Sequence, residues 1–242
     1  MEVLALVPSR EELTVLERLF RIARRFAATG QLSSSPTPLI RRAFGGKPIF
    51  FVQVGSNDGQ DGDPLHDLII ANPNWRGLFI EPLPDPFGRL VKGYGGSGRF
   101  IFEQIAISNR REERQFYHVP REAAEGHCLP CRFDQMGSFD RTHITKHDAR
   151  LDEVIVETTV KSEPLPFVLN RHGITGVDLI HIDVEGYDYE VLKQINFEQW
   201  QPKLILYESG HLNASDGKAA ISLLRSHGFE VVNCGLDTLA RR

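Results

Sequence analysis

The residues Ile49-Phe-Phe-Val-Gln-Val-Gly-Ser-Asn-Asp-Gly59 combine a short apolar run with a glycine-rich turn. The nearly continuous apolar run over 49–54 is typical of a strand that is buried on both faces of a parallel sheet. The glycines let the backbone of the turn approach a ligand closely, and its amide groups can bind a carboxylate or a phosphate. We therefore expect a strand whose carboxyl end lies at a binding site.

This turn differs from the dinucleotide-binding fingerprint. The pattern G-x-G-x-x-G requires glycine at the position of Asn57. No helical pattern begins directly after Gly59, which disfavours a pyrophosphate bound at a helix N-terminus.

Further apolar runs follow along the chain, and helical patterns separate most of them. The runs lie at 77–80, 100–106, 177–182 and 203–207, and helices are expected from Asp63, over 85–91, over 186–194 and over 215–227. Strands that alternate with helices predict an α/β fold with a parallel sheet. The stretch 114–160 interrupts the alternation with two expected strands, 115–119 and 154–160, around a polar segment. Since loops at the carboxyl ends of strands build the site in such folds, we expect this insertion to cover the substrate.

The composition is that of an ordinary soluble domain. The 242 residues are 41% hydrophobic and 25% charged, which argues against a disordered or fibrous chain. A formal charge of -4 argues against a nucleic-acid-binding protein. No apolar run approaches the ~18–20 residues of a membrane span, and no signal peptide is recognisable, so a cytoplasmic location is expected. A single Cys128-x-x-Cys131 pair is a poor indication of zinc even with His118, His127, His143 and His147 nearby, and free thiols are expected there.

The first 47 residues are expected to form a helical extension that precedes a domain over 48–242. An amphipathic helix is predicted over about 10–28, followed by a linker-like segment at 31–38. Residues 1–47 carry eight Lys and Arg against four acids, and the basic helix face is interpreted as solvated. The helix is expected to cover the domain or to form a homodimer.

Acidic residues stand where several predicted strands end. Glu81 lies 22 residues after Gly59. An adjacent parallel strand would place its carboxylate beside the first turn, where it can accept hydrogen bonds from both ribose hydroxyls of a nucleoside. Asp183 and Glu185 follow the run 177–182, and acids this close together are more often functional than structural. They can orient an acceptor hydroxyl, meet the cationic groups of a cofactor, or hold Mg²⁺.

Three further acids and a histidine complete the pattern. Asp188 and Glu190 are expected on the surface of the following helix. Glu208 ends the run 203–207, and His211 follows three residues later. Histidine is the default general base near neutral pH, so His211 is a candidate for that role.

Taken together, these strings resemble the FkbM-type S-adenosylmethionine-dependent methyltransferases. The resemblance spans roughly residues 48–240, and its most specific parts are Ile182-Asp-Val-Glu-Gly186 and the turn 55–59 followed by Ile80-Glu-Pro82. The other matching pieces are 63–65, 75–79, 106–108, 137–139, 204–208 and 237–240. The resemblance implies a doubly wound, Rossmann-like sheet of seven mostly parallel strands whose last strand is antiparallel, as in class I methyltransferases.

The resemblance also implies a binding mode for S-adenosylmethionine across the carboxyl ends of the first strands. It assigns Gly55, Ser56, Asn57 and Gly59 to the methionine part, Glu81 with the adjoining Pro82 to the ribose, Ala106 and Ile107 to the adenine, and Asp183 to the region of the transferred methyl group. Gln53 stands where methyltransferases commonly carry an acid that contacts the ammonium group. Asp58 or Asp183 is expected to take over that contact.

The implied reaction is methyl transfer to a hydroxyl of a sugar, polyketide or related small-molecule or glycan acceptor. Since the sulfonium donor is already activated, the protein has to align the reacting atoms and remove the hydroxyl proton. His211 or Asp183 is expected as the base, with Glu208 in support, and Mg²⁺ at Asp183, Glu185 and Glu208 is the variant of this mechanism.

Two alternatives stay open at this stage. A metal-dependent hydrolase would use the same acids and leave the turn and Glu81 without a nucleoside to hold. A non-catalytic module would bind the cofactor, or a partner through the basic N-terminal helix, and Gln53 is its only hint in the sequence.

Overall fold

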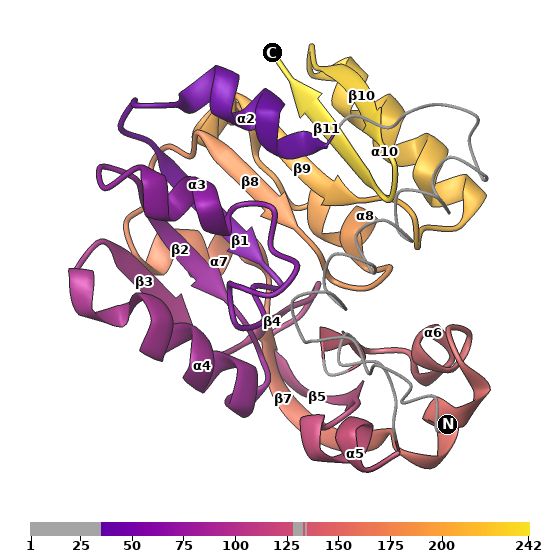
Figure 1. Cartoon of the computed structure of the whole chain (residues 1–242). Helices are drawn as coiled ribbons and strands as arrows, with labels where there is room; N and C mark the ends of the chain where they lie inside the picture. Colours follow the sequence, from indigo (N-terminus) through magenta and orange to yellow (C-terminus); the bar gives the residue numbers. More distant parts are fainter. Residues whose placement is uncertain (1–34, 128–132, 134) are drawn as a thin grey trace, which may run out of the picture.

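The computed structural model describes residues 35–127, 133 and 135–242 (Figure 1). The helix predicted over 10–28, and with it the homodimer contact, lies outside the described residues, as do Cys128 and Cys131. Among the described residues, no helix is both long and apolar enough to cross a membrane.

A seven-stranded sheet forms the centre of the described chain. Its strands are β1 Phe50–Val54, β2 Arg76–Ile80, β3 Phe100–Glu103, β8 Leu179–Ile182, β9 Leu204–Glu208, β10 Glu230–Cys234 and β11 Asp237–Arg241. They are arranged in the order β10-β11-β9-β8-β1-β2-β3. β11 runs antiparallel to both β9 and β10, and the other pairings are parallel. The strand order reverses between β1 and β8, which is the position where open α/β sheets bind ligands.

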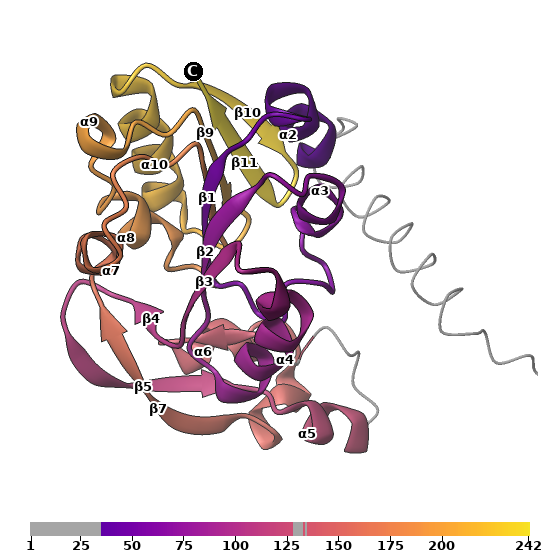
Figure 2. The same cartoon turned by 90° about the vertical axis from the view of Figure 1, so that its left-hand side faces the viewer.

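Helices cover both faces of this sheet (Figure 2). One face carries α7 Leu165–Arg171, α8 Asp188–Leu192, α9 Phe197–Trp200 and α10 Ala214–Ser226, and the other carries α2 Pro36–Phe44, α3 His66–Ala71 and α4 Pro84–Tyr94. Successive strand residues point to opposite faces of the sheet. Val52 and Val54 therefore pack in the core on the side of α7 to α10, while Phe51 packs in the core on the side of α2 to α4. Burial on both faces explains why these strands are continuous apolar runs.

The insertion forms a second, four-stranded sheet, in the order β4-β7-β5-β6. Its strands are β4 Ala106–Ile107, β5 Glu112–His118, β6 Gly137–Ser138 and β7 Val156–Glu163, joined by the helices α5 Arg121–Gly126 and α6 Arg141–Thr145 and by the 3-10 helix η3 Ala149–Glu153. We call residues 112–163 the cover lobe. It has a small core of its own, which includes Val119, Met136, Ile144 and Leu151.

Two sequence expectations differ from the structure. The run 100–106 was expected to be one strand, but β3 ends at Glu103, and Ala106 pairs with Ser162 of β7 instead. β3 is an edge strand, so the chain can leave the main sheet there and satisfy its backbone groups in the second sheet. The linker-like segment 31–38 ends in the helix α2, because proline is compatible with the first turn of a helix.

α2 packs as part of the domain core. Ile40 and Phe44 are buried in the same apolar cluster as Leu68 and Trp75. The domain therefore begins within the segment that the sequence pattern assigned to the extension.

We predict that Ile40→Ala lowers the free energy of unfolding by about 2–5 kcal/mol, because it leaves a cavity in a fully buried position. Arg42→Ala, on the exposed side of the same helix, is the control and should have little effect. Urea unfolding of both variants measures the difference, and equal stability would show that α2 does not contribute to the core.

Candidate active site

The carboxyl ends of β1, β2, β8 and β9 open into one cavity of about 870 Å³. The strand ends contribute Gly55, Glu81, Asp183 and Glu208 to its wall, and the cover lobe contributes residues such as Phe116, Met136, Phe139 and His147. The volume lies within the ~300–1,000 Å³ of small-molecule sites. The strand-end acids singled out in the sequence therefore share one cavity with the glycine turn.

The glycine turn is held by close backbone contacts. Gly55 has φ +77°, and a Cβ atom there would lie 1.8 Å from the carbonyl oxygen of Asp183. The amides of Gly55 and Ser56 both donate to the carbonyl oxygen of Ile80 at 3.0 Å. The hydroxyl of Ser56 donates to the carbonyl oxygen of Gln53 at 3.0 Å and accepts from the amide of Ile80 at 3.1 Å. Only glycine fits at position 55, and the turn ties the ends of three strands together.

Glu81 lies against this turn, as its spacing predicted. Its side chain is 5% exposed, and its two carboxylate oxygens accept hydrogen bonds from the amides of Asn57 and Leu83, each at 2.9 Å. Burial raises the pKa of Glu81 to about 7, and these hydrogen bonds act in the opposite direction. Each oxygen keeps a further lone pair with which it can accept a ligand hydroxyl.

Two of the residues assigned to the cofactor do not line the cavity. Asp58 accepts from the amides of Gln60 and Asp61 at 3.0 and 3.2 Å, and lies 3.4 Å from the guanidinium of Arg89. A Cβ atom at Gly59 would meet the side chains of α4 rather than the cavity. Both residues therefore support the turn on the side that faces away from the cavity.

Gln53 and His181 bring unsatisfied polar atoms to the cavity wall. Both side chains are buried and line the cavity. Within the described part of the chain, Gln53 Oε1 and His181 Nδ1 have no hydrogen-bond partner. Buried polar atoms normally have partners, so these two are available to a ligand.

Three carboxylates gather at the other end of the cavity. Asp183, Glu185 and Glu208 each place an oxygen within 4.8 Å of the others. Burial raises the pKa of Asp183 well above its usual value, and the charges of Glu208 and Glu185 act in the same direction. Glu185 has φ +51°, a conformation rarely adopted by residues with a side chain and common at functional sites.

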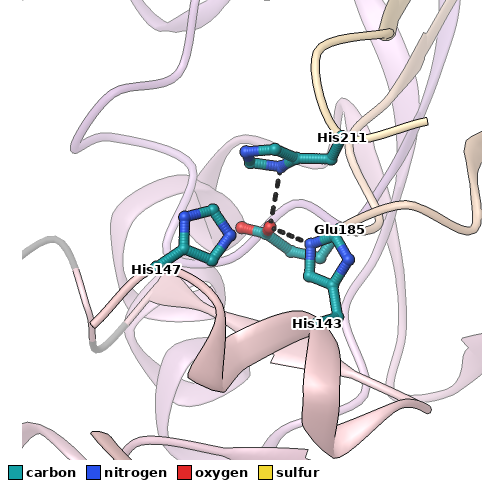
Figure 3. A group of neighbouring side chains, drawn as sticks. All are labelled: His143, His147, Glu185 and His211. Carbon is teal, nitrogen blue, oxygen red and sulfur yellow. Dashed lines mark hydrogen bonds and ion pairs between the residues drawn. The ribbon is translucent and has the colours of Figure 1, made fainter. Parts of the chain in front are cut away.

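Three histidines surround Glu185 (Figure 3). His211 Nδ1 lies 2.9 Å from Glu208 Oε2 and 3.2 Å from Glu185 Oε2, and His143 Nε2 lies 3.1 Å from Glu185 Oε2. Burial disfavours the charged form of His211, but hydrogen bonds with Glu185 and Glu208 outweigh it and raise the pKa to about 10. A histidine with this pKa holds its proton at neutral pH, so its environment favours the role of a cation over that of a base.

His143 and His147 are site residues that the sequence reasoning named only as neighbours of the Cys128-x-x-Cys131 pair and did not assign to the site. They lie in α6 and in the turn that follows it, within the insertion. The signal was present as H-x-x-x-H, since residues four apart lie on one face of a helix.

The prediction that Asp188 is a surface residue was wrong. Its side chain is 0% exposed, and its carboxylate accepts from the amide of Gly186 at 3.2 Å. Asp188 begins the short helix α8, directly after the loop that follows β8. Burial raises the pKa of its carboxyl group well above the usual value.

The sheet order, with a cavity at the carboxyl ends of β1, β2 and β8, defines an α/β fold of the class I methyltransferase type. The family model of the methyltransferase FkbM domain matches residues 53–231. The chain therefore belongs to the FkbM methyltransferase family. The family that the sequence resembles is thereby confirmed.

Solved structures with a similar fold have low sequence identity. The methyltransferase FkbM from Methylobacillus flagellatus KT is 11% identical, with a TM-score of 0.49 over 80% of this chain and 43% of that one. Fibrillarin from Aeropyrum pernix, in complex with natively bound S-adenosylmethionine, is 14% identical, with a TM-score of 0.43 over 92% of this chain and 73% of that one. An S-adenosylmethionine-dependent O-methyltransferase from Thermotoga maritima is 8% identical, with a TM-score of 0.45 over 90% and 69%. The chain thus spans less than half of the Methylobacillus chain, and no curated protein matches it.

Glu81 generates a prediction about pH. Its carboxyl group binds a proton more tightly in the folded protein, with a pKa of about 7, than at its ordinary value of 4.5. The folded state therefore holds more protons between these values, and the contribution of Glu81 to stability falls as the pH rises from about 4.5 to 7. Glu81→Gln does not titrate, so the difference in unfolding free energy between pH 4.5 and pH 8 should shrink by about 3 kcal/mol.

Urea unfolding at both pH values measures this effect. Glu113→Gln, which removes an exposed acid of the cover lobe, is the control and should keep the pH dependence of the wild type. An unchanged pH dependence in Glu81→Gln would contradict the raised pKa.

Proposed function

We propose that the enzyme transfers the methyl group of S-adenosylmethionine to a hydroxyl oxygen of a small-molecule or glycan acceptor, such as a sugar or a polyketide. The observation that carries this proposal is the convergence of Glu81, Gly55 and Asp183 on one cavity. The wall of this cavity contains Glu81, which can accept hydrogen bonds from ribose hydroxyls. Next to it lie Gly55, which has no side chain, and the buried acid Asp183.

The residues present fit S-adenosylmethionine. Glu81 would accept the ribose hydroxyls through its remaining lone pairs, and the wall formed by Pro82, Ala106 and Ile107 would contact the adenine. The unsatisfied Oε1 of Gln53 would accept from the ammonium group, in the place where an acid is common. Asp58 faces away from the cavity, so we assign no cofactor contact to it.

Asp183 is the base that we favour. When bound, the sulfonium cofactor supplies an activated methyl group, and what the chain must provide is alignment and a proton acceptor. The Asp183 carboxylate ends β8 beside Gly55 and lines the cavity. Its surroundings disfavour the charged form, which makes it a stronger base than an exposed carboxylate. Glu208 and Glu185 both lie within hydrogen-bond distance of His211.

The cover lobe is expected to bind the acceptor. Phe139 packs edge-on against Phe116 and Tyr187, with ring centroids 5.2 and 5.3 Å apart, and all three line the cavity. Arg114 lies over the ring of Phe139, 4.0 Å from its centroid. A wall of aromatic rings can pack against the carbon skeleton of a sugar or a polyketide, and this supports the proposed acceptor class.

Family membership supports methyl transfer over the hydrolase that the sequence left open. A hydrolase is not the reaction of this family, and it would leave Glu81 and the turn without a ligand. The non-catalytic alternative predicts S-adenosylmethionine binding without methyl transfer, and the two experiments below separate it from an enzyme.

We predict that Glu81→Ala weakens S-adenosylmethionine binding by about 10- to 100-fold, because charge-assisted hydrogen bonds worth about 1.5–3 kcal/mol are lost. Isothermal titration of wild type and variant measures this, with Glu113→Ala as the control. Wild type that does not bind at millimolar concentration would overturn the proposed function, and equal affinity of Glu81→Ala would overturn the ribose assignment.

We also predict that Asp183→Asn binds S-adenosylmethionine but loses about 10²–10⁴-fold in methyl transfer, the usual contribution of a general base. Transfer is followed from labelled donor to the fractionated products of a cell extract. Glu190→Gln, a change on the outer side of α8, is the matched control. If Asp183→Asn keeps wild-type activity while His211→Gln loses it, the base is His211.

A further inference from the structure

Four metal-binding side chains meet where the cover lobe contacts the main sheet. One donor atom from each of His143, His147, Glu185 and His211 lies within 4.8 Å of the other three. The first two histidines come from α6 and the turn after it, Glu185 follows β8, and His211 follows β9 (Figure 3). Three separate parts of the chain therefore supply the cluster.

The spacing of the donors suits a small cation. Glu185 Oε2 lies 3.1 Å from His143 Nε2 and 3.2 Å from His211 Nδ1. Ligand atoms of a tetrahedral zinc ion, at bond lengths of about 2.0–2.1 Å, lie about 3.3 Å apart. Small movements of the side chains would thus admit an ion. His147 is exposed, which opens a path from solvent to the cluster.

The backbone at Glu185 and Gly186 permits this approach. Both residues have positive φ, +51° and +90°. A Cβ atom at position 186 would come within 2.8 Å of the His143 ring. A side chain at this position would displace the ring of His143, so glycine allows the histidine to reach Glu185.

We propose that His143, His147, Glu185 and His211 bind a divalent transition-metal ion of the zinc type. Three imidazole nitrogens and one carboxylate oxygen are ligands typical of such ions, whereas Mg²⁺ and Ca²⁺ prefer oxygen. The ion fixes α6 to the loops after β8 and β9, at the edge of the cavity. Asp183 is not one of the ligands, so the proposal is separate from the assignment of the base.

Lys146 competes with the ion for His143. Its Nζ lies 3.0 Å from His143 Nδ1. An ammonium group that donates to Nδ1 keeps the imidazole proton on Nε2, where the ion needs a lone pair. The side chain of Lys146 is exposed and can move away. Its removal is therefore expected to favour metal binding, the opposite of removing a ligand.

The test is a titration of the full chain, after treatment with chelator, with Zn²⁺ by calorimetry and with Co²⁺ by visible absorption. We expect one ion per chain, and affinity at least about tenfold weaker in His143→Ala, His147→Ala and His211→Ala. Lys146→Ala should bind as tightly as the wild type or more tightly. His227→Ala, a surface histidine stacked on Phe197, is the matched control and should not change.

Three results would overturn the proposal. These are no stoichiometric binding of either ion, affinity unchanged in both His143→Ala and His211→Ala, and loss of binding in the double variant Cys128→Ser/Cys131→Ser. Circular dichroism and urea unfolding of each variant verify that it folds. Because the metal titration uses no methyl donor or acceptor, it can succeed where the proposed function fails.

Hydrogen exchange gives a second readout. Bound Zn²⁺ should slow exchange in the segment 141–147 of the wild type and not in His143→Ala. Equal exchange with and without Zn²⁺ in a protein that binds it would show that the ion does not fix α6.

Discussion

The contact between Gly55 and the backbone of Asp183 is the constraint on which the site depends. It joins the ends of β1 and β8 at the point where the strand order reverses, and it leaves no room for a Cβ atom. Because the strands meet so closely, the carboxylates of Glu81 and Asp183 end up on either side of one turn. The turn serves as the floor of the cavity, and everything that binds there is placed relative to it.

The cluster of Asp183, Glu185 and Glu208 links the main sheet to the cover lobe. Asp183, Glu185 and Glu208 repel one another in a partly buried environment, and such repulsion opposes folding unless opposite charges balance it. Hydrogen bonds with His143 and His211 outweigh the effect of burial on Glu185 and lower its pKa to about 2. One of these histidines comes from the cover lobe, so the position of that lobe and the charge of the strand ends depend on each other.

The fold was largely predictable because its evidence is local. A parallel strand that is buried on both faces needs an apolar run, and a turn without room for a side chain needs glycine, so both leave a mark in consecutive residues. The predictions were wrong where contacts between distant parts of the chain determine the structure. The run 100–106 is mostly apolar, yet the chain changes sheets within it because β7 offers a partner to Ala106. Asp188 is polar and lies on a short helix, yet its side chain is fully buried.

The sequence by itself determined the order of strands and helices, the family, and the acids that follow the strands. Each of these is visible as a pattern within a few residues or as a spacing between two strand ends. Only the tertiary structure decided which side chains share the cavity, that Asp58 and Gly59 support the turn from behind, and that His143 and His147 join Glu185 and His211. These histidines lie about forty residues before Glu185 along the chain. No local sequence pattern specifies that these histidines approach Glu185 in space, because the packing of the cover lobe against the ends of the strands brings them together.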